Sequence, residues 1–246
     1  MNREKDGTRA ERALASRIVE AVSLLITPVI LIACALSETD QTAALSFLVV
    51  MASLGIFFAG YEAAHPRLRD IMPTVVLAAL AAAGRILFAP IPDFKPVSAI
   101  AIIAGVVFGR KNGFMVGALA ALASNFFFGQ GAWTPWQMYA WGLVGYGAGL
   151  LTKVGSSNGR LVEMHPSVVY VYGFVSCLVY GFILNAWSIL AFYHAQASGV
   201  LGIVAVYATA LPFDVVHGIA TVVFLLALYA PWRKKLARIR VKFGLM

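Results

Sequence analysis

Long apolar stretches, separated by short polar connections, fill nearly the whole chain. Most are long and uniform enough for a membrane helix, and in lipid only helices and closed barrels satisfy every backbone hydrogen bond. The stretches are too long for the strands of a barrel. The pattern therefore predicts an all-α integral membrane protein with eight spans, at residues 18–36, 42–61, 71–89, 97–109, 114–128, 136–152, 167–192 and 203–230.

The stretch 97–109 is the shortest of the eight. At 1.5 Å per residue it rises by about 20 Å, whereas the hydrocarbon core of a bilayer is about 30 Å thick. A re-entrant pair of segments is the alternative. It would leave Arg110 and Lys111 at membrane depth, at a cost of roughly 2.5–3.5 kcal/mol each. We therefore predict a full span in a tilted or locally thinned setting.

The positive charges test this pattern independently, because Lys and Arg collect in the cytoplasmic connections of membrane proteins. With a cytoplasmic N-terminus, 17 of the 19 Lys and Arg residues fall on the cytoplasmic side. Of the other two, Lys95 lies on the opposite side and Arg85 within a span. Omitting any one helix would destroy this segregation. The charges predict a multi-pass protein with both termini cytoplasmic.

A short polar connection, HPRLRD at 65–70, divides the chain into two parts. Residues 1–65 hold a polar N-terminal segment and two helices with few polar groups beyond Ser and Thr. Residues 66–246 hold six helices and a basic tail. We predict that the first part is a two-helix membrane anchor and that the second is the working module.

Composition agrees with a membrane protein, since 61% of the residues are hydrophobic, 12% are charged and the mean hydropathy is +0.83. The net charge of +8 could indicate nucleic-acid binding. The basic residues sit in connections and tails, however, so we expect a lipid bilayer and no nucleic acid as partner. Cys34 and Cys177 lie in apolar segments and predict neither a disulfide nor a metal site.

Enzyme signatures are not found in the sequence. It has no G-x-S-x-G, H-E-x-x-H, P-loop or dinucleotide-binding G-x-G-x-x-G motif. We therefore predict that the protein is not an enzyme, that it needs no cofactor and that any ATP-driven step belongs to another chain.

Uncharged polar and aromatic side chains gather between the fifth and sixth stretches. The segment 113–149 holds no charge, but it holds Asn125, Gln130, Trp133, Trp136 and Gln137. In the predicted topology Arg85, Asn185 and Asp214 lie in the same outer half of the membrane. Polar groups inside a membrane are costly and commonly functional. The set suggests a docking site for an uncharged or zwitterionic organic molecule.

Each of these residues also has a structural interpretation. Arg85 could snorkel to the outer surface, and Asp214 could pair with Arg85 or with His217, three residues further on. The Asn side chains could join helices. For Trp133, Trp136, Tyr139 and Trp141 an interfacial aromatic belt is the favoured interpretation. Two alternative functions stay open: an intramembrane enzyme using Asp214 and His217, and a ligand-free scaffold subunit.

Four segments resemble a known family of membrane proteins. They are FKPVSAIAIIAGVVFG at 94–109, the segment 113–151, LPFDVVHGIATVVFLL at 211–226 and ARIRVKFGL at 237–245. They are similar to the substrate-binding S components of energy-coupling factor (ECF) vitamin transporters. The likeness covers roughly residues 70–246 and is most specific at 94–150.

The resemblance implies a six-helix bundle in a bacterial cell membrane, here preceded by two additional helices. It implies a pocket near the outer face, closed by the loop after the first core helix, which would include Phe94 and Lys95. The expected substrate is a vitamin or related micronutrient, with a cobalamin-type molecule as first guess.

The resemblance also implies partners, namely a transmembrane coupling subunit and two ATPase subunits. S components topple in the membrane when they join this module. An Ala-x-x-x-Ala pair on the first core helix, 71–89, would meet the coupling subunit. Two overlapping registers are present in this chain, Ala78/Ala82 and Ala79/Ala83.

Overall fold

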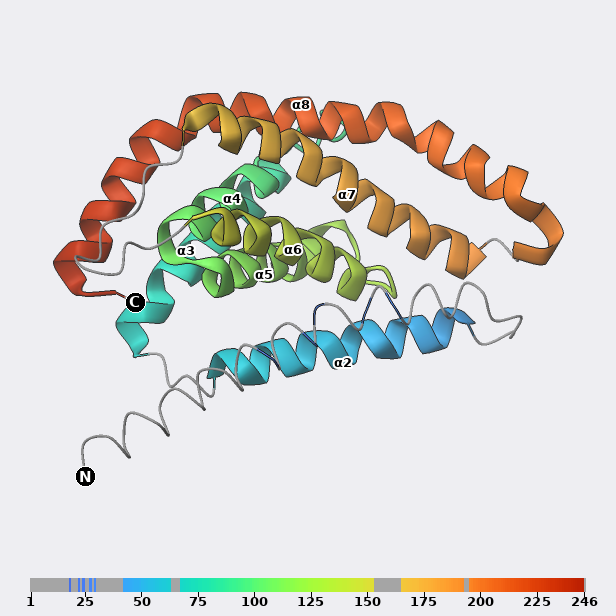
Figure 1. Ribbon diagram of the computed structural model, residues 1–246, viewed down its shortest axis with the longest axis horizontal. Coiled ribbons are helices and arrows are strands. Elements are labelled where there is room, and N and C mark those ends of the chain that lie inside the picture. Colours follow the sequence, from blue (N-terminus) through green and yellow to red (C-terminus); the bar gives the residue numbers. More distant parts are fainter. Residues whose placement is uncertain are drawn as a thin grey trace. The chain divides into compact units, whose positions relative to one another are not determined.

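The computed structural model describes positions 18, 22, 24, 27 and 29 and the ranges 42–62, 67–152, 165–192 and 195–245. Over these residues the structure has helices and no strand, which confirms the all-α class (Figure 1). The helices are α2 (Thr42–Glu62), α3 (Leu68–Leu87), α4 (Val97–Phe108), α5 (Arg110–Phe128), α6 (Thr134–Leu151), α7 (Pro166–Phe192) and α8 (Ala195–Phe243). Most of the predicted helix 18–36 lies outside the described residues.

The described helices differ in how well they could cross a membrane. By length and composition α3, α7 and the part of α8 from Gly199 to Phe243 are sufficient, which supports a membrane protein. α4 and the segment Phe47–Ala59 of α2 are apolar but shorter. The total of eight spans and the cytoplasmic placement of the termini stay predictions.

The chain divides into two compact units, Met1–Pro66 and Arg67–Met246. In the first unit, α2 buries Val50, Leu54 and Phe57. The hydroxyls of Thr27 and Ser53, both buried, form a hydrogen bond. A polar pair of this kind joins helices where the surroundings offer no water.

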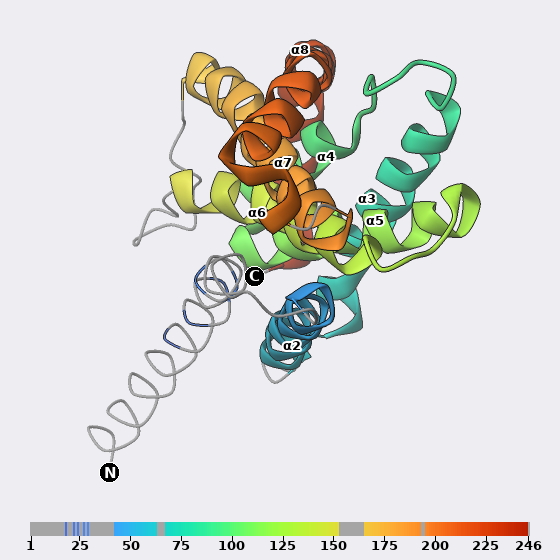
Figure 2. The same ribbon diagram turned by 90° about the vertical axis from the view of Figure 1, so that its right-hand side faces the viewer.

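The second unit is arranged around α4, which contacts α3, α5, α6, α7 and α8 and lies among them in both ribbon views (Figure 2). All twelve residues of α4 are buried. A helix without a lipid-facing or water-facing side needs no amphipathic pattern, which explains the uninterrupted apolar sequence VSAIAIIAGVVF. Its short length therefore reflects a central position in the unit.

Backbone contacts hold α4, α5 and α6 together. A Cβ atom added at Gly145 of α6 would lie 2.1 Å from the carbonyl oxygen of Gly113 on α5. A Cβ added at Gly105 of α4 would lie 2.1 Å from the carbonyl oxygen of Gly145. Only glycine allows such an approach, and small residues at helix crossings are typical of membrane bundles.

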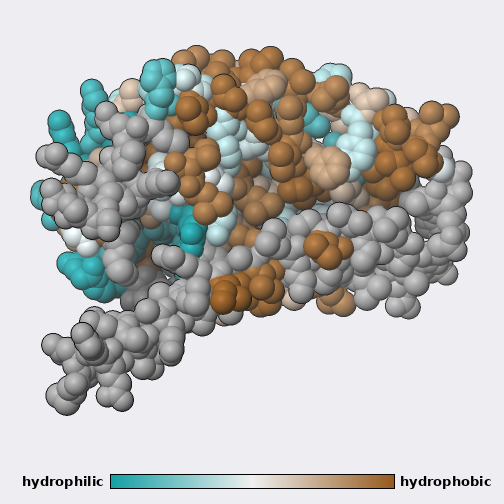
Figure 3. Space-filling model, in the orientation of Figure 1, coloured by the Kyte–Doolittle hydropathy of each residue, from teal (hydrophilic) through white to brown (hydrophobic). Residues whose placement is uncertain are grey.

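Large apolar side chains cover the outer faces of α7 and α8. Val171, Val175, Val179 and Phe182 on α7 are exposed, and on α8 so are Leu211, Phe213, Val216, Ile219, Val223 and Leu226. In the space-filling view hydrophobic residues cover these two helices, and hydrophilic residues gather where α8 ends (Figure 3). A continuous apolar surface of this kind suits contact with lipid.

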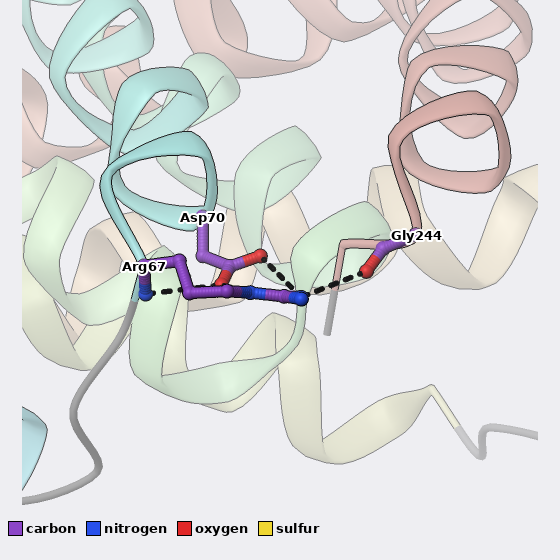
Figure 4. A network of polar contacts seen from close by, with 3 residues as sticks. All are labelled: Arg67, Asp70 and Gly244. Atoms are coloured by element: carbon purple, nitrogen blue, oxygen red, sulfur yellow. Dashed lines mark hydrogen bonds and ion pairs between the residues drawn. The ribbon is translucent and has the colours of Figure 1, made fainter.

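Arg67, where the second unit begins, contacts Gly244 near its end. The Arg67 side chain donates from Nε to the Asp70 carboxylate at 2.9 Å and from Nη2 to the carbonyl oxygen of Gly244 at 3.3 Å (Figure 4). In addition, Arg240 Nη1 donates to the carbonyl oxygen of Val107 at the end of α4, at 3.0 Å. These bonds fix the start of α3 and the end of α4 against the basic end of α8.

Candidate functional site

Arg85 lies in the last turn of α3 and is only 9% exposed. Its Nη1 donates to Ser124 Oγ and to Asn125 Oδ1 on α5, both at 2.6 Å. The guanidinium carbon lies 4.6 Å from the ring centre of Phe128 and 4.9 Å from that of Trp141. The buried Nε has no hydrogen-bond partner. Arg85 therefore points into the unit, and the snorkelling interpretation is wrong.

The pairing of Arg85 with Asp214, one of the structural alternatives for these residues, is not present in the described part of the chain. Within the described ranges, the ion pair that the structure contains joins Arg67 and Asp70. Asp214 accepts a hydrogen bond of 3.4 Å from Asn185 Nδ2 on α7. Its carboxylate fills the space beside Gly181, where an added Cβ would lie 2.0 Å from Oδ1. Asp214 and Asn185 thus join α7 to α8.

Around Trp141 a second group of side chains connects four helices. Trp141 Nε1 donates to Ser98 Oγ on α4 at 3.2 Å, and Ser98 Oγ lies 2.9 Å from His217 Nε2 on α8. The Tyr180 ring of α7 stacks on Trp141, with ring centres 5.0 Å apart, and meets the His217 ring edge-on at 4.9 Å. We call Arg85, Ser98, Ser124, Asn125, Trp141, Tyr180 and His217 the central cluster.

Gln137 and Trp136 extend this arrangement along α6. Gln137 Nε2 donates to the Tyr180 hydroxyl at 3.0 Å, and its buried Oε1 has no partner. Trp136 is fully buried, its Nε1 has no partner, and its ring centre lies 5.8 Å from that of Trp187. Both residues therefore offer an unpaired polar atom inside the unit, and such atoms are uncommon in native structures.

The prediction of an interfacial aromatic belt is wrong for three of its four residues. Trp136, Tyr139 and Trp141 are at most 3% exposed and belong to the interior of the unit. Trp133, at 41% exposed, lies in the connection between α5 and α6, where a belt residue is expected. Hydropathy marks aromatic residues near a helix end, but it does not say which side of the helix carries them.

Seven of the ten predicted site residues make no hydrogen bond or ring contact with the central cluster in the described part of the chain: Phe94, Lys95, Gln130, Trp133, Trp136, Asn185 and Asp214. Gln130 is exposed and donates to the carbonyl oxygen of Leu122 at 3.1 Å. Trp133 is exposed, and Asn185 and Asp214 bond to each other. Of the predicted set, the structure thus brings Arg85, Asn125 and Gln137 together in the central cluster or in direct contact with it.

The connection between α3 and α4 carries Phe94 and Lys95. The Phe94 ring centre lies 6.0 Å from Phe88 and 5.1 Å from Phe224 of α8, so the connection is fastened across the unit. Burial lowers the pKa of Lys95; the charge of Asp93 raises it and that of Arg85 lowers it further. Lys95 is therefore close enough to Arg85 for their positive charges to interact.

Sequence reasoning missed Ser98, Ser124, Thr134 and Tyr180. Thr134 Oγ1 accepts a hydrogen bond of 3.0 Å from Asn125 Nδ2 and so orients the Asn125 amide. Each of the four is a hydroxyl residue at or near an apolar helix segment. The rule that polar groups inside a membrane are commonly functional would have selected them, but Ser and Thr are too frequent in such helices to stand out.

On α3 the two Ala-x-x-x-Ala registers differ in exposure. Ala78 and Ala82 are buried, at 4% and 6% exposed, whereas Ala79 and Ala83 are exposed. Beside them lies an apolar groove of about 350 Å³ between α3 and the last part of α8. It is lined by Met72, Pro73, Val76, Leu77, Leu80, Trp232, Lys235, Leu236 and Ile239.

A comparison with protein families identifies the second unit. The model of the family described as "ECF-type riboflavin transporter, S component" matches residues 67–234, more than half of the chain. The chain belongs to this family. Neither the curated proteins nor the solved structures gave a match. The S component is the substrate-binding membrane subunit of an ECF vitamin transporter and works together with an ECF module.

The family decides between the alternatives left open by the sequence. S components are transporter subunits, so the prediction that the protein is not an enzyme is confirmed. The enzyme alternative also fails on geometry, because His217 faces Ser98 on α4 whereas Asp214 faces Asn185 on α7. No group of three His, Cys, Asp or Glu residues suited to a metal occurs among the residues searched, which are the described ones. The riboflavin-type family lends no support to the cobalamin-type guess.

Proposed function

We propose that this S component captures a flat, ring-bearing vitamin in the outer half of the second unit, with riboflavin as the first candidate. The observation that carries the proposal is the central cluster, which lies wholly within the residues that the riboflavin-type family matches. Trp141 and Tyr180 supply aromatic faces, and Gln137 and Asn125 supply amide groups. Apolar sites with a few fixed polar groups are typical of small-molecule binding.

The connection between α3 and α4 is the proposed lid. Phe94 packs on Phe88 and Phe224, and Lys95 lies close enough to Arg85, at the end of α3, for the two positive charges to repel each other. Asp93 adopts a left-handed backbone conformation, with φ of 54°, which Asp tolerates better than most residues other than glycine and which is typical of a turn. A turn held by aromatic contacts can open at modest cost, and opening would admit a substrate to the central cluster.

The proposed topology places both termini in the cytoplasm, as the distribution of Lys and Arg predicts. The exposed pair Ala79 and Ala83 is then the surface that meets the coupling subunit, because the other register is already buried. Two ATPase subunits complete the proposed complex and supply the energy that this chain lacks.

The test is uptake of labelled riboflavin by a riboflavin-requiring bacterium without its own importer. The strain would express the chain together with an ECF coupling subunit and two ATPases. Uptake should require the chain and should vanish when the ATPases are inactivated. The purified chain should bind riboflavin without ATP, and a panel that includes cobalamin would show whether the substrate choice is right. The proposal would be refuted if the strain showed no uptake and the purified chain bound no vitamin of the panel.

A pair of variants connects the test to the central cluster. Trp141→Phe keeps an aromatic ring but loses the hydrogen bond to Ser98, and it should weaken binding several-fold. Phe127→Leu is the control, because Phe127 is 74% exposed on α5 and its side chain is not part of the buried cluster. Equal affinity of both variants would place the substrate elsewhere.

A further inference from the structure

We propose that the apolar groove between α3 and the last part of α8 binds one anionic phospholipid, with an acyl chain in the groove and the phosphate beside Lys235. No residue that lines the groove belongs to the central cluster. The lipid site is therefore separate from the proposed vitamin site and does not depend on which vitamin the chain captures.

One face of each helix lines the groove. The lining residues recur at helical spacing along α3 and along α8, so each set forms a continuous stripe. Leu77 is buried between the two stripes, whereas Met72, Val76, Leu80 and Ile239 are exposed. The groove is thus open to the surroundings of the unit along its length.

The lining suits a hydrocarbon chain. Eight of the nine lining residues are apolar or aromatic, and Lys235 is the exception. The volume of about 350 Å³ falls within the range of small-molecule sites, about 300–1,000 Å³. A polar ligand would lose water here and find almost no hydrogen-bond partner, which is costly. An acyl chain needs none, and α3 is apolar and long enough for lipid to surround it.

The α8 wall of the groove belongs to a strongly basic segment. Residues 233–242 hold six Lys and Arg residues, and no Asp or Glu occurs after Asp214. Among the described residues of the second unit, the acidic ones are Asp70, Asp93 and Asp214, and the ion pair present joins Asp70 to Arg67. Positive charge is therefore in large excess at this end of the unit.

Lys235 and two further cations lie along one side of this segment. Lys235 lines the groove, and Arg238 and Lys242 follow it three and seven residues later. Residues at these intervals share a helix face, so the three charges lie in a row beside the groove. All three are exposed, and none forms an ion pair with a described carboxylate. A lipid phosphate would supply the negative charge that this surface lacks.

Trp232 and Lys235 are residue types of the boundary between hydrocarbon and head groups. Trp is enriched at that boundary, and the long Lys side chain reaches from an apolar surface to water. Basic pockets between membrane helices commonly bind anionic head groups. An apolar helix of a partner would fill the groove equally well, but it would bring no counter-charge to Lys235. A phospholipid satisfies the apolar walls and the charge together.

The groove is held in place without a ligand. Arg67 at the start of α3 donates a hydrogen bond to Gly244 just beyond α8 (Figure 4), and Arg240 donates to Val107 at the end of α4. Both bonds fasten the last part of α8 against the rest of the unit. A preformed site loses little conformational freedom when it is filled, which favours binding.

The test compares two phospholipids with identical acyl chains, phosphatidylglycerol and phosphatidylcholine. Native mass spectrometry of the purified full chain, titrated with each lipid in detergent, measures their affinities for the wild type and four variants. Lys235→Gln removes the charge in the groove. Its control is Lys234→Gln, because Lys234 is also exposed but does not line the groove. Val76→Trp fills the groove. Its control is Val75→Trp, because both valines are 48% exposed and Val75 does not line the groove.

We expect the wild type to bind phosphatidylglycerol roughly five-fold more tightly than phosphatidylcholine, as for one Lys at a membrane surface. Lys235→Gln should remove most of that preference, and Lys234→Gln should keep it. Val76→Trp should weaken the binding of both lipids because it blocks the acyl chain. Val75→Trp should leave both affinities unchanged.

Three results would overturn the lipid site. The first is a wild type without preference for the anionic lipid. The second is an equal effect of Lys235→Gln and Lys234→Gln, which would mean attraction to the basic segment as a whole. The third is unchanged lipid binding by Val76→Trp with lost copurification of the coupling subunit, which would assign the groove to that subunit.

A second variant keeps the groove test decisive if Val76→Trp does not fold. Ile239→Trp fills the same groove from α8, and its melting temperature shows whether the unit stays intact. Riboflavin binding, measured on the same variants, should stay unchanged throughout. The failure of the lipid site would therefore leave the proposed function standing, and the failure of riboflavin binding would leave the lipid site standing.

Discussion

Gly145 of α6 offers the sharpest test of how the second unit is packed. The substitution Gly145→Ala adds one methyl group, whose carbon would lie 2.1 Å from the carbonyl oxygen of Gly113 and 2.4 Å from its carbonyl carbon. Nonbonded heavy atoms attract best at about 3.5–4.0 Å. α5 and α6 must therefore move apart by more than about 1 Å. The clash is with backbone, so no rotation of a side chain can relieve it.

The cost follows from weaker packing along both neighbouring helices. A gap of about 0.5–1 Å forfeits roughly a quarter to a half of the dispersion attraction between each pair of atoms across an interface. Overpacking typically destabilises by about 1–3 kcal/mol. The Gly145 carbonyl also lies against Gly105 of α4, so two interfaces are disturbed. We expect the upper end of that range, about 3 kcal/mol, which corresponds to a fall in melting temperature of roughly 6–12 °C.

Thermal unfolding of the purified protein in detergent, followed by tryptophan fluorescence, measures this change. The matched control is Gly55→Ala in α2, because an added Cβ there meets no atom within 4 Å. Alanine is the better helix former, so the control should melt at the same temperature or slightly higher. An unchanged melting temperature for Gly145→Ala, or an equal loss in both variants, would refute the backbone contact.

Three further predictions concern the partner surface, the α7–α8 contact and the lid. Ala79→Leu should abolish copurification with the coupling subunit and leave the melting temperature unchanged, whereas Ala78→Leu should lower the melting temperature because Ala78 is buried. Asp214→Ala should lower the melting temperature and leave substrate affinity nearly unchanged, since Asp214 joins α8 to Asn185. A loss of affinity at an unchanged melting temperature would make Asp214 a ligand contact. Burial lowers the pKa of Lys95 below 10.5, so the unfolded chain binds the extra proton between the two pKa values. Stability relative to Lys95→Met should therefore rise with pH through that window, and melting temperatures that fall there would contradict it.

The helices could be predicted from the sequence because lipid leaves a strong apolar signal, but their ends could not. α5 begins at Arg110, directly after Gly109 with its φ of 92°, whereas hydropathy starts the helix at residue 114. α8 continues to Phe243 through the basic segment WRKKLARIRVKF, whereas hydropathy ends it at 230. Hydropathy detects contact with lipid, and a helix can extend beyond the apolar region wherever its polar residues reach water or bond to a neighbour.

The partners of the polar side chains could not be predicted, because spacing along a helix does not specify which neighbour each residue faces. Asp214 and His217 are three residues apart, which leaves them about 60° apart around the axis of α8. That angle is small enough to suggest a shared site, yet α8 packs against both α4 and α7. His217 reaches Ser98 on α4, and Asp214 reaches Asn185 on α7. Arg85 on α3 is a second example: its position around the helix axis turns it toward Ser124 and Asn125 of α5, and it forms no ion pair with any described carboxylate. Which polar side chains meet is therefore set by how the helices pack, and the identities of the polar residues alone do not reveal it.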